Sequence, residues 1–468
     1  MFIIRDTMAT KKRRVVLSED AKRSKKARLL RKLRDGVGQY LEPQDEGYRE
    51  LVSSAYNKFR LIPSHQTPLS LHSRVQLSLS CLLSSGYFMH NLVTKETKIL
   101  LTPVTRFITG IRGLTYPYLG LRLFAFPWEF EGDPKSDVEK SLCVLRVLND
   151  YMELKGNELC GERGANEFNM TLVNYMDPDH VTIPLVTEPY YAMGTSAVHW
   201  HSDQSVRDDC SIGVYSSTVG ESNESEPWSI GLKIAWDVTT SAVKVPLLNG
   251  SCYFLLNDMN TTHQHTVIVG DNARFSSTHR VVVLDGNTLE YISGRCRQAE
   301  MIAKRLNGEG SVCCQDKLEE CLDVQREVEF EWIRQFWSLG RLNAERHAGF
   351  WLREIERIEQ TWERVESAVK TLYDNLLERG DTKSYEDKQS QSRSVAGTMC
   401  CAKIILQHLE RRADERQQWT KRYNSSVLRY LADNDQPIKR PSFPCRHPHF
   451  SYDQTEAMDA LKSILNKP

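Results

Sequence analysis

The hydrophobic pattern of this 468-residue chain changes its period near residue 292, and this change limits the fold more than any other feature. Before that point, short aromatic and β-branched runs alternate with turn signals such as DPDH and GESNES, which is typical of antiparallel strands. After it, apolar residues recur in steps of four and three, which indicates amphipathic helices. A chain of this length exceeds one ordinary core, so we predict two domains and an α+β protein.

The first domain, residues 36–292, is predicted to be a double-stranded β-helix, or jelly roll, because its strand-like runs are short and closely spaced. These runs are RLFAFPW (122–128), MTLVNYM (170–176), AVHWHSD (197–203), CSIGVYSST (210–218), WSIGLKIAWDV (228–238), SCYFLL (251–256), HQHTVIV (263–269) and RFSSTHRVVVL (274–284).

The second domain, residues 293–468, is predicted to be an all-α helical bundle. Its clearest signal is one long amphipathic helix with an apolar stripe that we expect to be packed core: Trp351, Ile355, Ile358, Trp362, Val365, Val369, Leu372 and Leu376. Trp332, Phe336 and Leu339 indicate an earlier helix, and Cys401, Ile405, Leu409 and Trp419 a later one. The polar segment 378–392 is expected to link two of these helices.

The charges of the chain are unevenly spread. The whole chain has a net charge of zero, but residues 1–35 contain 13 Lys and Arg against 4 Asp and Glu, so this segment carries +9 and the remainder −9. We interpret residues 1–35 as a basic, disordered tail that acts as a nuclear import signal and helps to hold nucleic acid. We therefore expect a nuclear protein, with the cytoplasm as a second compartment. Because the chain contains no run of about 18 apolar residues, we expect no membrane span.

The stretch AVHWHSDQ contains three metal-binding residue types at alternate positions: His199, His201 and Asp203. On a strand, alternate side chains share one face, so this pattern predicts part of a metal site. A further ligand has to come from elsewhere, and the segment THQHTV offers His263 or His265.

The segment RFSSTHR predicts an anion site beside the metal. Alternation places Arg274, Ser276, Thr278 and Arg280 on one face of a strand and His279 on the other, so we expect a structural role for His279. Two histidines and a carboxylate form the facial triad of non-haem Fe(II) oxygenases. An arginine fork suits the far carboxylate of a 2-oxo acid that chelates the iron. A catalytic zinc hydrolase is the alternative, because the same ligands suit zinc.

Together, WHSD (200–203), HQH (263–265) and RFSSTHR (274–280) resemble the AlkB-like Fe(II)/2-oxoglutarate-dependent dioxygenases, with Ser276 where the family pattern has asparagine. Further segments resemble the N6-methyladenine demethylases of this family and extend the likeness over nearly the whole chain, including the helical domain. These are LLTPVTRFITG, TYPYLGLRLF, CYFLL and EVEFEWIRQFW.

The resemblance implies a role for particular residues. The metal ligands, which are also the catalytic residues, would be His201, Asp203 and His265. The 2-oxoglutarate contacts would be Asn174, Tyr253, Arg274, Ser276 and Thr278. The methylated base would contact Arg106, Tyr118 and Arg280, and also residue 204, which is Gln204 here and glutamate in those demethylases.

The implied reaction is oxidative demethylation of N6-methyladenine in single-stranded RNA, or in single-stranded DNA, with Fe(II), O2 and 2-oxoglutarate. Its products would be succinate, CO2 and formaldehyde. One alternative is a repair demethylase for bases such as 3-methylthymine or 3-methyluracil in single strands. An alternative of another class is a non-catalytic nuclear binding or scaffold protein, acting through the helical domain on partners that the sequence does not identify.

Overall fold

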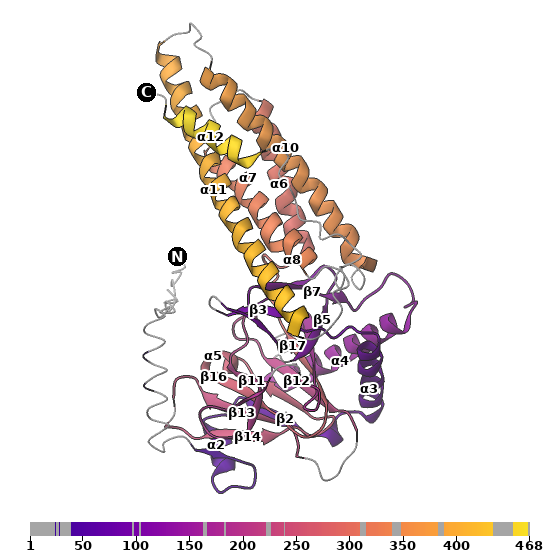
Figure 1. Cartoon of the computed structure of the whole chain (residues 1–468). Helices are drawn as coiled ribbons and strands as arrows, with labels where there is room; N and C mark the ends of the chain where they lie inside the picture. The colour runs from indigo at the N-terminus through magenta and orange to yellow at the C-terminus, as the bar shows by residue number, and fades with distance from the viewer. Residues whose placement is uncertain are drawn as a thin grey trace, which may run out of the picture.

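The computed structural model describes residues 39–95, 98–102, 104–161, 166–181, 184–220, 226–237, 239–308, 315–338, 348–381, 388–433 and 453–466, besides two isolated residues of the N-terminal segment. The predicted basic tail (1–35) otherwise lies outside the described residues. A strand-rich part is followed in the chain by a long bundle of helices (Figure 1). Among the described helices, none combines the length and apolar character that crossing a bilayer requires.

The strand-rich part contains two large, mainly antiparallel sheets, as a jelly roll requires. The six-stranded sheet has the order β1 (Tyr40–Leu41), β14 (Ala242–Pro246), β13 (Ser229–Ile234), β16 (His263–Ile268), β11 (Thr195–His201), β10 (Val186–Thr187). The seven-stranded sheet has the order β2 (Phe59–Ile62), β15 (Cys252–Leu255), β12 (Ile212–Thr218), β17 (Arg274–Arg280), β9 (Met170–Met176), β5 (Thr105–Gly110), β8 (Phe126–Pro127). Two hairpins add β3 (Leu92–Lys95) with β4 (Lys98–Leu101), and β6 (Thr115–Tyr118) with β7 (Leu121–Phe124).

Period-2 alternation produces the core between the large sheets, because every second side chain of a strand faces inward. The six-stranded sheet contributes Ile230 and Val243, and the seven-stranded sheet contributes Val214 and Leu255; all four are buried in one cluster. The fold class predicted from the sequence is therefore confirmed. Each predicted strand overlaps an observed one, but β11 runs from Thr195 to His201 and the run 122–128 is divided between β7 and β8.

Two helices cover the other face of the seven-stranded sheet, α3 (Leu69–Ser84) and α4 (Asp137–Cys160). Leu79 of α3 and Leu148 of α4 are fully buried in a cluster with Phe275 of β17. Helix α4 begins at Ser136, whose side chain accepts a hydrogen bond from the backbone N–H of Glu139, and ends at Gly161 in the left-handed conformation. These are the caps that helix termini favour.

Two short helices complete the strand-rich part, α2 (Tyr48–Ser54) and α5 (Met259–Thr262), with one 3-10 turn, η2 (Ser64–Gln66). The bundle contains α6 (Leu289–Gly308), α7 (Gln315–Glu327), the π-helical turn η3 (Val328–Ile333), α8 (Arg334–Ser338), the π-helical turn η4 (Ala348–Leu352), α10 (Arg353–Asp381), α11 (Lys388–Asp433) and α12 (Gln454–Leu465).

The predicted apolar stripe from Trp351 to Leu376 runs along η4 and α10 and is buried over its whole length. Trp332 and Phe336 are buried as well, whereas Leu339 lies outside the described residues. The stripe is therefore packed core, as predicted.

The β6–β7 hairpin joins the two parts. Phe124 of β7 belongs to the hydrophobic core of the bundle and makes edge contacts with the rings of Trp332 and Trp351. Trp351 donates a hydrogen bond from its indole N–H to the carbonyl of Ala125 at 2.7 Å. The guanidinium of Arg122 lies 4.5 Å from the ring centre of Trp332 and donates to the carbonyl of Glu331 at 2.7 Å. The β6–β7 hairpin is thus one of the contacts that anchor the bundle on the strand-rich part.

Candidate metal centre

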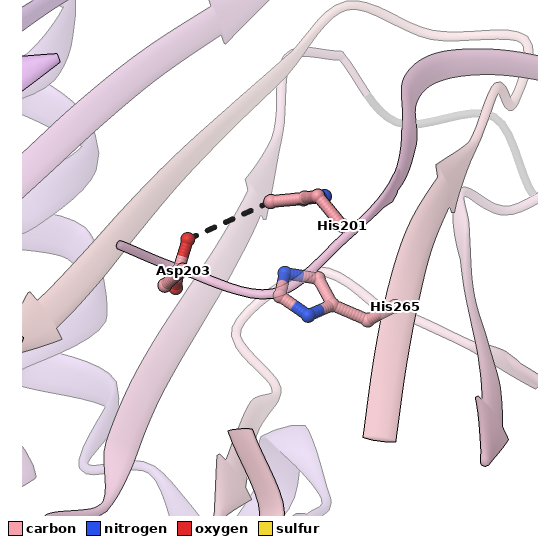
Figure 2. A group of neighbouring side chains, drawn as sticks. All are labelled: His201, Asp203 and His265. Atoms are coloured by element: carbon pink, nitrogen blue, oxygen red, sulfur yellow. Dashed lines mark ion pairs between the residues drawn. The ribbon is translucent and has the colours of Figure 1, made fainter. Parts of the chain in front are cut away.

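Two histidines meet where strand β11 ends and strand β16 begins. The antiparallel register pairs His201 directly with His265, and their ring centres lie 4.1 Å apart. Residues that pair directly in an antiparallel sheet point to the same face. Figure 2 shows both imidazoles converging with the carboxylate of Asp203. Potential ligand atoms of these three residues all lie within 4.8 Å of one another.

Alternation along AVHWHSDQ is broken in the structure. The register between β11 and β16 shifts between Ser196 and Val198 and again between Val198 and His201. Asp203 lies beyond the end of β11, and His199 is exposed outside the converging group. The expectation that all three residues share a strand face is therefore wrong for His199, because bulges rotate side chains out of the simple period.

The choice between His263 and His265 is decided by contacts. Nε2 of His263 lies 3.0 Å from the carbonyl oxygen of Ala55, and its Nδ1 lies 2.9 Å from the hydroxyl of Thr262. Both ring nitrogens of His263 thus contact atoms outside the group formed by His201 and Asp203. The structure therefore brings together His201, Asp203 and His265, the set that the family resemblance implies.

Asp203 is buried, and its carboxylate is only partly satisfied. Nη2 of Arg280 donates to Oδ1 at 2.8 Å, whereas Oδ2 has no hydrogen-bond partner among the described residues. Burial by itself would raise the pKa of this carboxyl, but Arg280 and the two histidines outweigh burial and lower it. The group is therefore a carboxylate at neutral pH, with one oxygen left over for a cation.

The donor set fits a divalent metal. Burial is the main cause that lowers the pKa of His265, to about 3, with His201 adding to it, so this imidazole is neutral and has a free lone pair. Two imidazoles and a carboxylate with an unpartnered oxygen form the facial triad that Fe(II) oxygenases use. Zinc would accept the same ligands.

Strand β17 provides the neighbouring polar face. Arg274 is 1% exposed and donates from Nε to the hydroxyl of Ser216 at 2.8 Å, whereas its Nη1 has no partner among the described residues. Burial lowers the pKa of this guanidinium to about 10, which still leaves it charged at neutral pH. A buried charge with an unused donor is costly unless a ligand meets it. Arg274 is therefore suited to bind a carboxylate.

The other residues expected to contact 2-oxoglutarate lie on the same sheet. Ser276 pairs with Asn174 of β9, whose amide donates to the serine hydroxyl at 3.4 Å. Thr278 pairs with Val214 of β12, and Tyr253 of the next strand pairs with Val214 on its other side. Burial raises the pKa of the Tyr253 phenol, with Arg274 opposing that shift, so the hydroxyl remains protonated and can donate.

On the opposite face of β17, His279 has the structural role predicted for it. Its Nδ1 lies 2.9 Å from Oδ1 of Asn149 and 3.0 Å from the hydroxyl of Thr171, and its Nε2 lies 3.1 Å from the hydroxyl of Ser277. This fully buried histidine is therefore not a metal ligand.

The residues expected to recognise the base form an aromatic and cationic group beside the triad. The guanidinium of Arg106 lies 4.6 Å from the ring centre of Tyr118, and the rings of Tyr116 and Tyr118 stack with their centres 6.4 Å apart. Arg280 donates to the hydroxyl of Tyr116 at 3.0 Å, besides its contact with Asp203. We call the stacked rings of Tyr116 and Tyr118 the aromatic platform. Arg280 therefore contacts both the metal group and this platform.

Sequence reasoning missed Tyr116, which connects the aromatic platform to the segment 201–204 that carries two of the candidate ligands. Its hydroxyl donates to the backbone carbonyl of Gln204 at 2.7 Å, and the side chain of Gln204 is exposed. The alternation of tyrosines in TYPY could have indicated this residue, since Tyr116 and Tyr118 share one strand face. Sequence reasoning also missed Asn260, which bonds to the backbone of Asp203.

Comparison with known proteins shows likenesses over both parts of the chain. The sequence model of the FTO catalytic domain matches residues 46–283, and that of the FTO C-terminal domain matches residues 287–463. The chain is 30% identical over 494 residues to "Alpha-ketoglutarate-dependent dioxygenase FTO" of Xenopus laevis, covering 94% of each protein. A solved 2OG-Fe(II) oxygenase family structure from Burkholderia pseudomallei covers 52% of this chain and 94% of its own, at 11% identity and a TM-score of 0.31. That structural likeness is too weak to bear on the fold.

Proposed function

Because the chain belongs to the FTO family of alpha-ketoglutarate-dependent dioxygenases, we propose that it removes the N6-methyl group of adenine in single-stranded RNA by oxidation. Alpha-ketoglutarate is 2-oxoglutarate, and the family uses it with Fe(II) and O2. The observation that carries the proposal is the convergence of His201, Asp203 and His265 beside an aromatic platform. The unpartnered donor of Arg274 supports the co-substrate assignment.

In this proposal, His201, Asp203 and His265 hold the iron, and Arg274 binds the far carboxylate of 2-oxoglutarate. Hydrogen bonds from Tyr253, Asn174, Ser276 and Thr278 would fix the co-substrate's orientation. When bound, Fe(II) would activate O2, the oxidant. One oxygen atom would oxidise 2-oxoglutarate to succinate and CO2, and the other would hydroxylate the N-methyl group, which then leaves as formaldehyde. The chain's own contribution is to hold both reactants within reach, which is where enzymes gain much of their rate.

The methylated base would stack on Tyr118, with Arg106 on the ring of that tyrosine. A base must leave its neighbours to reach the iron, which costs a few kcal/mol and least in a single strand. Stacking on an aromatic side chain offsets part of that cost, because it contributes about 1–3 kcal/mol per base. Arg280 and the exposed side chain of Gln204 are the remaining groups that we assign to the base.

The segment that links β9 to β11 supports a preference for single strands. It is long for a connection between strands, and long loops are often functional. Glu188 of this segment is 2% exposed, and its carboxylate accepts hydrogen bonds from the backbone N–H groups of Tyr190 and Tyr191 and from the indole of Trp200. The loop is therefore fixed against the strand that carries His201. We propose that this loop excludes a second nucleic-acid strand from the metal group.

We extend the proposal to localisation. Residues 1–35 carry a net charge of +9, and we propose that they direct the protein to the nucleus.

The test is turnover of methylated oligonucleotides by the purified protein with Fe(II) and 2-oxoglutarate, followed by mass spectrometry of base and co-substrate. The panel contains N6-methyladenine and 3-methylated pyrimidines, each in RNA and DNA and each single- and double-stranded. We expect the greatest loss of methyl from N6-methyladenine in single-stranded RNA, with succinate formed in equal amount. Faster turnover of a 3-methylated pyrimidine would make repair demethylation the better assignment. Absence of turnover on the whole panel, in iron-loaded protein, would refute the enzyme proposal.

A further inference from the structure

Asp203 is held through its backbone by a single side chain from a distant segment. The amide group of Asn260 accepts a hydrogen bond from the N–H of Asp203 at 2.8 Å and donates one to the carbonyl oxygen of the same residue at 3.0 Å. Asn260 is 6% exposed and lies in α5, three residues before the first residue of β16. One reciprocal pair of hydrogen bonds thus joins Asp203 to the segment that leads into β16, the strand of His265.

This pair of hydrogen bonds takes over where the backbone pairing of β11 with β16 stops. Strand β11 ends at His201, and the last paired position with β16 is His201 opposite His265. Beyond that position, the hydroxyl of Ser202 donates to the carbonyl of His263 at 2.9 Å, and the amide of Asn260 then takes both backbone groups of Asp203. Without these contacts, no strand partner would fix the backbone of Asp203.

The carboxylate of Asp203 has a second restraint in Arg280, which donates to Oδ1 and not to Oδ2. Arg280 pulls the carboxylate toward β17, whereas Asn260 holds the backbone to the segment that leads into β16. Both restraints together determine where the unpartnered Oδ2 lies relative to His201 and His265.

We propose that Asn260 is a positioning residue of the metal centre, which fixes Asp203 relative to His265 and thereby sets the affinity for Fe(II). The inference rests on the proposed role of His201, Asp203 and His265 as metal ligands. An amide is required because it donates and accepts at once without charge. Alanine does neither, and serine is too short to span both backbone groups.

The chain contains a matched control. Asn169 makes the same reciprocal pair with the backbone of Val282, which donates to Oδ1 at 2.8 Å and accepts from Nδ2 at 3.0 Å. This pair lies in the same domain and involves none of the three candidate ligands. Replacing Asn169 therefore removes the same two bonds and leaves the metal centre's own contacts in place.

The experiment is an anaerobic titration of the full-length metal-free protein with Fe(II), followed by calorimetry, and with Co(II), followed by its visible absorption. We expect Asn260→Ala to weaken Fe(II) binding by about 10- to 100-fold, the usual effect of losing a partner that orients a metal ligand. The Co(II) spectrum should change in shape, which a purely global loss of stability does not cause. Asn169→Ala should lower the melting temperature but keep the Fe(II) affinity of the wild type.

Asn260→Ser provides a second variant in case alanine prevents folding. Its affinity should also fall, and the rise in melting temperature on adding saturating Fe(II) should be smaller than in the wild type. Wild-type affinity in either folded Asn260 variant, or an equal loss in Asn169→Ala, would overturn the proposal. So would failure of both Asn260 variants to fold, since the pair would then be a determinant of the fold. Failure of the wild type itself to bind Fe(II) would instead refute the proposed function.

Discussion

Arg280 and Asp203 form an ion pair inside the protein, with Nη2 2.8 Å from Oδ1 and both side chains 5% exposed. The pair connects the last residue of β17 to the metal group of β11 and β16. Because a buried carboxylate is otherwise unfavourable, Arg280 keeps Asp203 ionised and ready to bind a cation.

Arg280→Gln should therefore make the protein more sensitive to acid. Burial raises the pKa of Asp203, and the variant loses the largest opposing influence, so the carboxyl keeps its proton to a higher pH. A carboxyl with a lowered pKa stabilises the fold at higher pH, and this contribution is lost as pH falls through its folded-state value. The loss should begin at a higher pH in Arg280→Gln than in the wild type. Melting temperatures of the metal-free protein across a pH series measure this shift. Arg280→Lys, which keeps the charge, should restore part of the wild-type dependence of melting temperature on pH. The same dependence in Arg280→Gln and the wild type would contradict the role of Arg280 in keeping Asp203 ionised.

Arg274→Lys should raise the KM for 2-oxoglutarate and leave Fe(II) affinity nearly intact. The guanidinium has an unused Nη1 that a lysine ammonium cannot reproduce in the same geometry. A hydrogen bond to a charged group contributes about 1.5–3 kcal/mol, which corresponds to a roughly 10- to 100-fold rise in KM. Co-substrate dependence of turnover is the measurement. Arg112→Lys, at an exposed ion pair with Glu131, is the control. An unchanged KM would mean that another group binds the co-substrate.

Asp203→Ala should abolish Fe(II) binding, because it removes one of three ligands and the only carboxylate among them. His199→Ala is the matched control, since His199 is a histidine of the same strand that lies outside the converging group. Equilibrium dialysis with Fe(II) should show no bound iron for the first variant and wild-type binding for the second. Iron retained by Asp203→Ala would require a different ligand set.

Gln204→Glu should change the relative rates on N6-methyladenine and 3-methylated pyrimidines. The amide both donates and accepts, whereas a carboxylate only accepts at neutral pH. The backbone carbonyl of residue 204 should keep its bond from Tyr116, so the platform remains in place. Competition between the two substrates in one reaction gives the ratio directly. A uniform change in both rates would show that the side chain does not contact the base.

Arg122→Met should destabilise the protein at the junction of its two parts. The guanidinium donates to two buried acceptors, the hydroxyl of Thr115 and Oδ1 of Asn287, so its loss leaves both without this donor. Each unsatisfied buried group costs about 1–3 kcal/mol, and we expect the free energy of unfolding to fall by at least that amount. Urea unfolding measures it. Arg357→Met, at an ion pair with Glu354 on the surface of α10, is the control and should stay within about 0.5 kcal/mol, as surface substitutions usually do. Equal stability of both variants would contradict this role for Arg122.

Local patterns in the sequence were sufficient to predict the fold class and part of the candidate site. The change of hydrophobic period predicted a double-sheet domain followed by a helical bundle, and the stripe from Trp351 to Leu376 is buried as expected. Alternation along RFSSTHR correctly separated Arg274 from His279, because β17 is regular: it pairs with β9 over its whole length and with β12 from Arg274 to His279. Period-2 and heptad-like patterns are local properties, and the backbone geometry of a regular element is enough to convert them into faces.

Only the tertiary structure decided which residues of the metal segments come together. Alternation failed along β11 because two register shifts interrupt it, and His199 stays outside the group that Asp203 joins. Alternation left His263 and His265 equivalent, and only the family resemblance favoured His265. The physical difference between them depends on Ala55, whose carbonyl oxygen contacts His263 from a segment 208 residues away. The pairings of Asp203 with Arg280 and with Asn260 span 77 and 57 residues. Such contacts follow from the packing of two sheets and the segments between them, and no local periodicity encodes them.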